Sequence, residues 1–481
     1  MPRTGETTAP PLPATSSQWT TKNIVIMLVI GIGALMVSLT QTLLVPVMPD
    51  LAVNLHTSAD GVAWILTSTL LVSAVAVPAY GRLGDLFGIR RMLLIALGSL
   101  VVGSVICGLA DNLAWMIVGR SVVGLASAVV PLGISLVGVA LPPDKARSGI
   151  AVVSAMLGVG GALGLPLAGV IAEYADYHWL FWICVIGGAV ALPAVGLLVP
   201  EPPTSAQGRF DIPGTLLLGA GILALLLPLS QGESWGWGSA RTLGLLALAA
   251  VLLVVFVLAE LRIESPLVDV RTTSRPALLL TNVASVCVGF ALFATLIGTA
   301  SYVQAPKATG YGFGASVLVG GLCMLPGGLG ILFFSPVSAK MKPRTALAVG
   351  ALIIAVGFLS RIWLTGAIWQ VVVGASITGV GTGIAYAAMP GLIIHATPRA
   401  ELAAANGFNT LCRSVGSSLA SAIGGSILAG VTIKLGEYEI ASLTAYRILF
   451  GVCAGAAVLG ALLALLIPKH AESADAAMHD E

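Results

Sequence analysis

The segment GRLGDLFGIRR, from Gly81 to Arg91, decides the fold, because it separates the apolar runs AWILTSTLLVSAVAVPAY and MLLIALGSLVVGSVICGLA. Each run is long enough to cross the roughly 30 Å hydrocarbon layer of a bilayer as a helix. A short charged loop between two such runs predicts a helical hairpin in a membrane. A polar turn on the side of the membrane where loops are rich in Lys and Arg explains the arginines. It explains neither Asp85 nor the spacing of the glycines.

The rest of the chain repeats this pattern. Of its 481 residues, 57% are hydrophobic and only 9% are charged, which leaves too little polar surface for a soluble globular domain. The mean hydropathy is +1.00. The apolar runs are continuous rather than alternating, so they predict an all-α polytopic membrane protein and not a β-barrel. We predict fourteen spans, at residues 24–48, 62–80, 92–110, 113–139, 148–172, 179–199, 212–230, 243–259, 277–303, 315–338, 345–363, 368–394, 402–430 and 444–467.

Basic residues predict the orientation. An even number of spans places both termini on one side, and the loops of that side hold about sixteen Lys and Arg, against about five opposite, Arg361 among them. Both termini are therefore predicted to be cytoplasmic. The Ala/Gly/Val-rich composition fits a bacterial inner membrane, where the protein would be multi-pass. Arg120 and Arg413 belong to neither set of loops, because both fall inside apolar runs.

An internal repeat organises the chain. VGRSVVG at 118–124 aligns with VGASITG at 373–379, and the same offset pairs Pro143 with Pro398, Gly161 with Gly416 and Gly169 with Gly424. Shared glycines alone could reflect general helix packing, but a fixed offset favours a duplication. We predict a disordered cytoplasmic N-terminus at 1–23, a six-helix bundle at 24–199, two inserted spans with linkers at 200–276, a second six-helix bundle at 277–467 and a cytoplasmic tail at 468–481.

Signals for enzymatic chemistry are absent from the sequence. There is no Walker loop, no H-E-x-x-H and no G-x-S-x-G, so no enzyme and no organic cofactor is predicted. All six cysteines lie in apolar runs without the spacing of metal ligands, so no metal site is predicted. The net charge of +2 gives no indication of nucleic-acid binding, and we expect no such partner.

The segment between the second and third predicted spans resembles the hallmark of the major facilitator superfamily, G-x-L-[AG]-D-x-x-G-[RK]-[RK]. The matching residues are Gly81, Asp85, Gly88, Arg90 and Arg91, with Ile89 placing the basic pair one residue later than the commonest form. The resemblance implies the major facilitator fold, two pseudo-symmetric six-helix bundles with two inserted central spans. It also implies a gating role for this loop, in which Asp85 and Arg91 hold the bundles together on the cytoplasmic side.

Further motifs are similar to the exporters of this family. GGALGLPLAG resembles their fifth-span pattern through Gly160, Gly164, Pro166 and Gly169, although Leu165 occupies the usual proline position. YVQAPKATGYGFGASVLVGGLCMLP and NTLCRSVGSSLASAIGG resemble the fourteen-span drug:proton antiporter branch. This resemblance implies secondary active efflux of a lipophilic drug, antibiotic or secondary metabolite, by alternating access coupled to proton influx. The alternatives are an importer or facilitator of a small nutrient, and a transport-dead membrane sensor with a soluble domain for its partners.

Candidate site residues follow from burial of polar groups in the predicted spans. Arg120 matches the family's buried arginine, which implies a charge facing the central cavity, and the alternative is a cap on neighbouring carbonyls. Arg413 is a second candidate for the cavity or for coupling, but for it we favour a structural role, since its side chain could snorkel to the cytoplasmic surface. The cavity candidates, for which helix–helix hydrogen bonding is the alternative, are Thr40, Gln41, Asn282, Gln304 and Tyr386.

The predicted spans hold no deep Asp or Glu. Thr40 and Val45 stand where cation exporters of this branch have Asp and Asn, which argues against a specialised pump for quaternary ammonium compounds. Proton coupling needs a titratable group, and the candidates are Asp50, Glu173, Asp85 and His395. The expected partners are a small-molecule substrate and the lipid bilayer, with the protein a monomer.

Overall fold

The computed structural model describes residues 20–44, 47–203, 208–435 and 438–468, and almost all of them lie in helices. The elements of the first half are α1 Thr21–Thr42, α2 Met48–Asn54, α3 Ala59–Phe87, α4 Ile89–Gly108, α5 Leu113–Leu125, η2 Ala126–Ala128, α6 Val129–Ala140, α7 Pro143–Tyr174 and α8 Trp179–Leu198. The inserted region holds α9 Ile212–Trp235, α10 Ala240–Glu260 and α11 Val270–Thr273.

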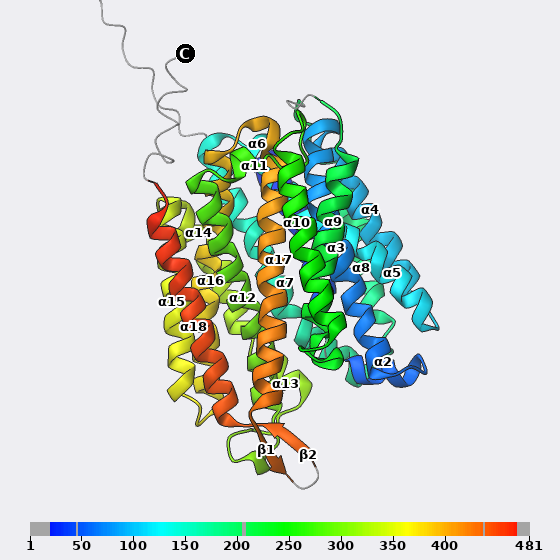
Figure 1. The fold of residues 1–481 in the computed structure, drawn as a ribbon, viewed down its shortest axis with the longest axis vertical. Helices are drawn as coiled ribbons and strands as arrows, with labels where there is room; N and C mark the ends of the chain where they lie inside the picture. The colour runs from blue at the N-terminus through cyan, green and yellow to red at the C-terminus, as the bar shows by residue number, and fades with distance from the viewer. Residues whose placement is uncertain (1–19, 45–46, 204–207, 436–437, 469–481) are drawn as a thin grey trace, which may run out of the picture.

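The second half begins with α12 Pro276–Gln304, and its other elements are η3 Lys307–Thr309, α13 Val317–Leu322, α14 Leu325–Ala339, α15 Pro343–Trp363, α16 Ile368–Ala396, η4 Arg399–Glu401, α17 Leu402–Gly430, β1 Thr432–Leu435, β2 Tyr438–Ala441 and α18 Leu443–Leu466. The two strands form an antiparallel hairpin in which Thr432 pairs with Ala441. The sequence predicted only a loop there. We name the end of the molecule with this hairpin the hairpin end, and the opposite end, where α3 meets α4, the motif end (Figure 1).

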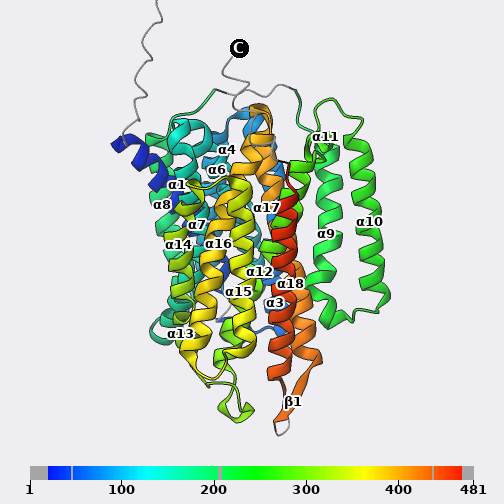
Figure 2. The ribbon, with the colours of Figure 1, turned by 90° about the vertical axis from the view of Figure 1, so that its left-hand side faces the viewer.

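Within the described residues, fourteen helical segments cross the molecule. Thirteen of them are long and apolar enough to span a membrane. The remaining predicted span is α17, which runs the length of the molecule beside α12 and α18 (Figures 1 and 2). It is more polar because Asn406, Asn409 and Arg413 lie on it, and all three side chains are buried inside the protein instead of facing lipid.

Each half has its own hydrophobic core, and the inserted pair lies outside both. One core joins α12, α15, α16 and α18, and two clusters fill the interior of α1 to α8. Helices α9 and α10 form a hairpin at the side of the molecule (Figure 2). Residues of α9, among them Leu218 and Ile222, pack with Ala74 of α3 and Leu411 of α17. The inserted pair therefore covers one seam between the two halves.

Equivalent helix crossings in the two halves depend on glycine. In the first half, a Cβ atom at Gly160 would lie 2.6 Å from Cβ of Ser38, where α7 crosses α1. In the second half, a Cβ at Gly416 would lie 2.1 Å from the carbonyl oxygen of Val286, where α17 crosses α12. Small residues at such crossings let backbones approach closely in a membrane protein. Gly161, which the repeat pairs with Gly416, instead faces open space.

We expect Gly416→Ala to destabilise the protein. The new methyl group collides with a backbone oxygen that cannot move alone, and such overpacking costs about 1–3 kcal/mol. Gly455→Ala in α18 is the matched control, because a Cβ atom there would meet no described atom within 4 Å and Ala is favoured over Gly inside a helix. Thermal unfolding of the purified protein should show a lower Tm for Gly416→Ala only. Equal Tm values for both variants would contradict the close crossing.

Candidate functional site

The segment that the sequence predicted to be a gating loop is almost entirely helical. Helix α3 continues to Phe87 and α4 starts at Ile89, so both predicted spans at this junction were too short. Gly88 alone separates the two helices, with a φ of 110° that favours glycine. The charged residues before and after it therefore sit on rigid helix ends.

Asp85 joins the two halves of the protein at the motif end. Its carboxylate is only 5% exposed. Oδ1 accepts a hydrogen bond from the backbone N–H of Ala403 at 3.0 Å, and Oδ2 accepts one from Ala404 at 2.8 Å. These are the first turn of α17, where backbone N–H groups lack helical partners and the helix dipole favours an anion. A Cβ at Gly81 would lie 2.5 Å from the carbonyl oxygen of Ala403, so this glycine permits the close approach.

Arg90 and Arg91 make their contacts within the first half. The backbone N–H groups of both residues donate to the carboxylate of Glu201, each at 3.1 Å, so Glu201 caps the N-terminus of α4. The Arg90 guanidinium donates to the carbonyl of Gly196 in α8. The side chain of Arg91 is exposed. The structure thus assigns the contact between the halves to Asp85 and the α17 backbone, and not to a pair of Asp85 with Arg91.

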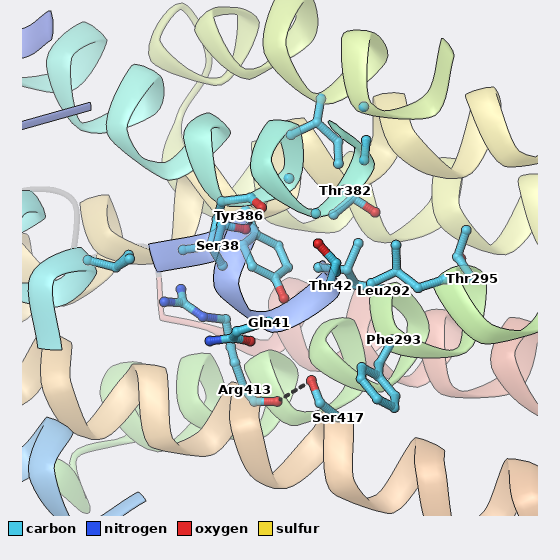
Figure 3. Close-up of a pocket in the computed structure, with 18 of the residues that line it drawn as sticks. Ser38, Gln41, Thr42, Leu292, Phe293, Thr295, Thr382, Tyr386, Arg413 and Ser417 are labelled. Atoms are coloured by element: carbon cyan, nitrogen blue, oxygen red, sulfur yellow. Dashed lines mark hydrogen bonds between the residues drawn. The ribbon is translucent and has the colours of Figure 1, made fainter. Parts of the chain in front are cut away.

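A central cavity of about 160 Å³ lies between the two halves (Figure 3). Helices α1, α3, α6 and α7 line it from the first half, and α12, α14, α16 and α17 from the second. Its wall is mainly aliphatic, with Phe293 and a set of hydroxyl groups. The polar lining residues are Ser38, Gln41, Thr42, Ser73, Ser127, Thr295, Thr378, Thr382, Tyr386, Thr410, Arg413, Ser414 and Ser417.

Arg413 is the only charged side chain among the described residues that line this cavity. It is 5% exposed, and its Nη1 and Nη2 atoms donate to Asn409 Oδ1 at 3.3 Å and to Thr410 Oγ1 at 2.8 Å. Its guanidinium carbon lies 5.0 Å from the ring centroid of Tyr386. Figure 3 shows Arg413, Gln41 and Tyr386 drawn together from α17, α1 and α16. The expectation that Arg413 snorkels to the surface is wrong, because α17 turns the side chain into the protein.

Arg120 lies inside the first half and not in the central cavity. It is 2% exposed, and its Nη1 donates to the backbone carbonyl of Thr40 at 3.1 Å. Its neighbours around a void of about 10 Å³ include Ser104 of α4 and Cys184 of α8. The prediction of a charge facing the central cavity is therefore wrong, since α5 directs this side chain toward α1, α4 and α8. The alternative, a cap on a neighbouring carbonyl, describes its contact.

Arg361 is a third buried arginine, which the sequence pattern placed in a loop. It is 1% exposed on the last turn of α15 and donates from Nη2 to Thr299 Oγ1 at 2.8 Å. Its guanidinium carbon lies 4.1 Å from the ring centroid of Phe450 in α18. The residue ends an apolar run, which is typical of a membrane boundary. The only sign in the sequence that its side chain points inward is its spacing of three residues from Phe358, on a helix that continues to Trp363.

The other predicted residues divide between the cavity and more distant places. Gln41 and Tyr386 line the central cavity. Thr40 lies beside Arg120, with its hydroxyl bonded to the Val37 carbonyl. Asn282 lines a second cavity at the motif end and accepts a hydrogen bond from Asn409 at 2.9 Å. Gln304, at the hairpin end of α12, lies against Gly320 of α13.

The predicted proton-coupling candidates also lie outside the central cavity. Glu173 is exposed near the hairpin end of α7. Asp50 is in α2, but its side chain lies outside the part of the chain that the structure describes, as does all of Val45. His395 Nε2 lies 3.3 Å from Nη2 of Arg147, a contact between α16 and α7.

The second cavity, of about 180 Å³, is strongly charged. Arg82, Glu264, Asp269 and Glu401 line it together with Asn282. Burial raises the pKa of Glu401, the Asp269 carboxylate raises it further, and Arg82 opposes both effects. Because Asn409 contacts both Asn282 and Arg413, a chain of hydrogen bonds links this cavity to the central one.

The predicted exporter motif on α7 connects α1 with the other half of the protein. Gly160 and Gly164 face Ser38 and Thr42 of α1. Nearer the hairpin end, a Cβ at Gly321 of α13 would lie 2.6 Å from the backbone nitrogen of Pro166, and Gly169 lies against Leu318. Helix α7 therefore contacts the second half on the hairpin side of the cavity, as Asp85 does at the motif end.

Two six-helix halves, a central cavity between them and separate contacts at each end define a multi-pass membrane transporter and not an enzyme. The family model described as Major Facilitator Superfamily matches residues 30–418 and 284–480. The chain belongs to this superfamily, which confirms the family and the fold expected from the motifs. As a member, it lies in a lipid bilayer and binds a small-molecule substrate.

Individual relatives carry names that describe resistance or export. The chain is 28% identical to the "Tetracenomycin C resistance and export protein" of Streptomyces glaucescens over 416 residues, 84% of this chain and 75% of the relative. It is also 28% identical to "Multidrug resistance protein Stp" of Mycobacterium tuberculosis over 410 residues, 83% of this chain and 74% of the relative. The crystal structure of the human organic anion transporter MFSD10 (TETRAN) matches with a TM-score of 0.63 and 14% identity, over 92% of this chain and 100% of that chain. At that identity the likeness concerns the fold alone.

Proposed function

We propose that this protein exports a lipophilic small molecule, a drug, antibiotic or secondary metabolite, from a bacterial cell by alternating access coupled to proton influx. The observation that carries the proposal is the central cavity, with contacts between the halves on each side of it. Asp85 and α17 close the motif end, and α7 and α13 meet nearer the hairpin end. Breaking the contacts at one end while keeping those at the other would open the cavity to one side of the membrane at a time.

The cavity wall supports a lipophilic cargo. Aliphatic side chains and Phe293 supply an apolar surface, and the hydroxyl groups offer hydrogen bonds for a few polar atoms. The names of the two relatives point in the same direction, since both describe resistance or export. In this proposal the motif end is cytoplasmic, because Lys22, Arg82, Arg90 and Arg91 lie there.

Proton coupling has no carboxylate in the described cavity wall. Asp85 and the second cavity at the motif end hold the titratable groups nearest to the contact between the halves. A substrate that itself exchanges a proton would need none of them. The coupled proton is therefore carried either by a carboxylate at the motif end or by the exported molecule itself.

We expect an imposed pH gradient to drive drug movement by the purified protein in liposomes. An internal pH dye should report proton flux when a substrate such as a fluorescent drug is added, and dissipating the gradient should abolish accumulation. Drug movement at the same rate with and without the pH gradient would contradict proton coupling. Cells that express the protein should exclude the drug, and cells that accumulate it would favour an importer.

A further inference from the structure

The central cavity contains a buried positive charge without a negative partner among the described residues. We propose that Arg413 is the binding site for an anionic group, a carboxylate or an acidic phenol, of the exported molecule. The inference rests on the proposed function, and it deepens that function by naming the chemical class of the cargo as amphipathic organic anions.

The charge of the cavity is unbalanced. None of the described residues lining it is Asp or Glu, and no ion pair involves Arg413 among the residues that the structure describes. A buried cation is costly unless an anion accompanies it, and arginine keeps its proton under all physiological conditions. The neutral contacts of Arg413 with Asn409, Thr410 and Tyr386 reduce this cost without removing the charge. A bound anion would complete the site.

The guanidinium of Arg413 is also held in place. Asn409 presents its Oδ1 atom to Arg413 because its Nδ2 atom donates to Asn282 Oδ1 at 2.9 Å and to Ser285 Oγ at 2.7 Å. A guanidinium has five N–H groups in a fixed planar fork, and the described contacts use Nη1 and Nη2 once each. The remaining N–H groups can bind a carboxylate at two points, a geometry that a lysine cannot offer.

The charged group and the α12 side chains Leu292 and Phe293 occupy different parts of the cavity wall, and hydroxyl groups lie between them (Figure 3). Gln41 and Tyr386 lie with Arg413, whereas Leu292 and Phe293 of α12 lie on another side (Figure 3). A ligand with one anionic group and an apolar or aromatic body matches this arrangement. A lipophilic cation would meet a like charge and no carboxylate from the described wall.

Arg361 provides a comparison within the same half. It is equally buried, but it packs among Phe358, Phe450 and Thr299 and does not line the central cavity. An arginine needed only to brace helices would take a position of this kind. Arg413 differs because its side chain borders the cavity that the substrate would occupy.

The test uses two dyes with the same xanthene core and opposite charge, fluorescein and rhodamine 123. Binding is measured by fluorescence polarisation to the full chain in nanodiscs of phosphatidylcholine. We expect the wild-type protein to bind fluorescein at least tenfold more tightly than rhodamine 123. Arg413→Gln should lose at least tenfold in affinity for fluorescein and none for rhodamine 123, and Arg413→Lys should keep part of the preference.

Arg361→Gln is the control, and it should leave the ratio of the two affinities unchanged. A preference of the wild-type protein for rhodamine 123 would overturn the proposal even if no Arg413 variant folds. So would unchanged fluorescein binding in folded Arg413→Gln. Liposome transport separates the two proposals: movement of rhodamine 123 but not fluorescein refutes the anion site alone. Arg413-dependent binding of fluorescein without movement of either dye refutes export but not the site.

Discussion

We expect Asp85→Asn to reduce transport at least tenfold while the protein still inserts into the membrane and folds. Asn has the same size as Asp, so packing against Gly81 and α17 is preserved. It carries no charge, however, and only one of its two terminal atoms can accept a hydrogen bond. Its NH₂ group would face the N–H of either Ala403 or Ala404, leaving that donor without a partner.

The size of the effect follows from the kind of bond that is lost. Hydrogen bonds to charged groups contribute about 1.5–3 kcal/mol each, and a loss of about 3 kcal/mol changes an equilibrium constant by roughly 100-fold. Because these bonds join the two halves, the loss acts on the equilibrium between the state closed at the motif end and the state open there. The variant should therefore populate the open state and complete the cycle slowly.

The matched control is Glu201→Gln. Glu201 also caps a helix with two backbone N–H groups, those of Arg90 and Arg91, but this helix belongs to the first half. Its loss should lower the free energy of unfolding by about 1 kcal/mol and leave the cycle intact. Spin labels at the exposed residues Lys22 and Lys340, one in each half, should report a longer distance at the motif end for Asp85→Asn only. Full transport by Asp85→Asn would show that the transport cycle does not depend on this contact.

The sequence was sufficient for the fold because its strongest signal, long continuous apolar runs, is also the physical constraint on a membrane helix. It was sufficient for α17 as well, although that helix is too polar to qualify on hydropathy, because the internal repeat aligns Gly416 and Gly424 with glycines of the fifth predicted span. Helix ends were less predictable. Gly81 to Phe87 was assigned to a loop since charges and glycines usually end a span, yet buried contacts with α17 stabilise the helix.

Directions of side chains could not be predicted for the arginines. A helix that is apolar on every side has no polar face to show its rotation, so Arg120 and Arg413 could not be assigned to the bundle interior or the cavity. In the structure Arg413 lines the central cavity and Arg120 lies inside the first half, which is the opposite of what the sequence favoured. Arg361 was missed for a different reason, because a basic residue at the end of an apolar run is the usual mark of a membrane boundary.

Arg120 and Arg361 nevertheless make similar contacts in the two halves, although the sequence repeat does not align them. Arg120 binds Thr40 of α1, and Arg361 binds Thr299 of α12, and these are the first helices of the two halves. The arginines come from non-equivalent helices, α5 and α15, and the repeat aligns Arg120 with Ala375. Each half thus uses one fully buried arginine to fix the helix that carries Gln41 or Thr295 to the cavity.

We expect Arg120→Ala to lower both stability and transport, and Arg120→Met to separate the two effects. The Ala variant leaves a void in the first half, and large-to-small changes of long buried side chains cost about 2–5 kcal/mol. Met fills most of that space, and replacing a buried charge by an apolar residue of similar volume is often neutral for stability. It cannot donate to the Thr40 carbonyl, so the turn of α1 that carries Gln41 is no longer held.

Arg120→Met should therefore recover the wild-type Tm but transport at least tenfold more slowly, with a raised KM as the sign of a misplaced cavity wall. Thermal unfolding in detergent and initial rates in liposomes measure the two quantities on the same preparation. If Met restores both, Arg120 serves packing only, and the hydrogen bond to Thr40 has no part in transport. If Met restores neither, the guanidinium itself is required for folding, through its charge or its hydrogen bond to Thr40.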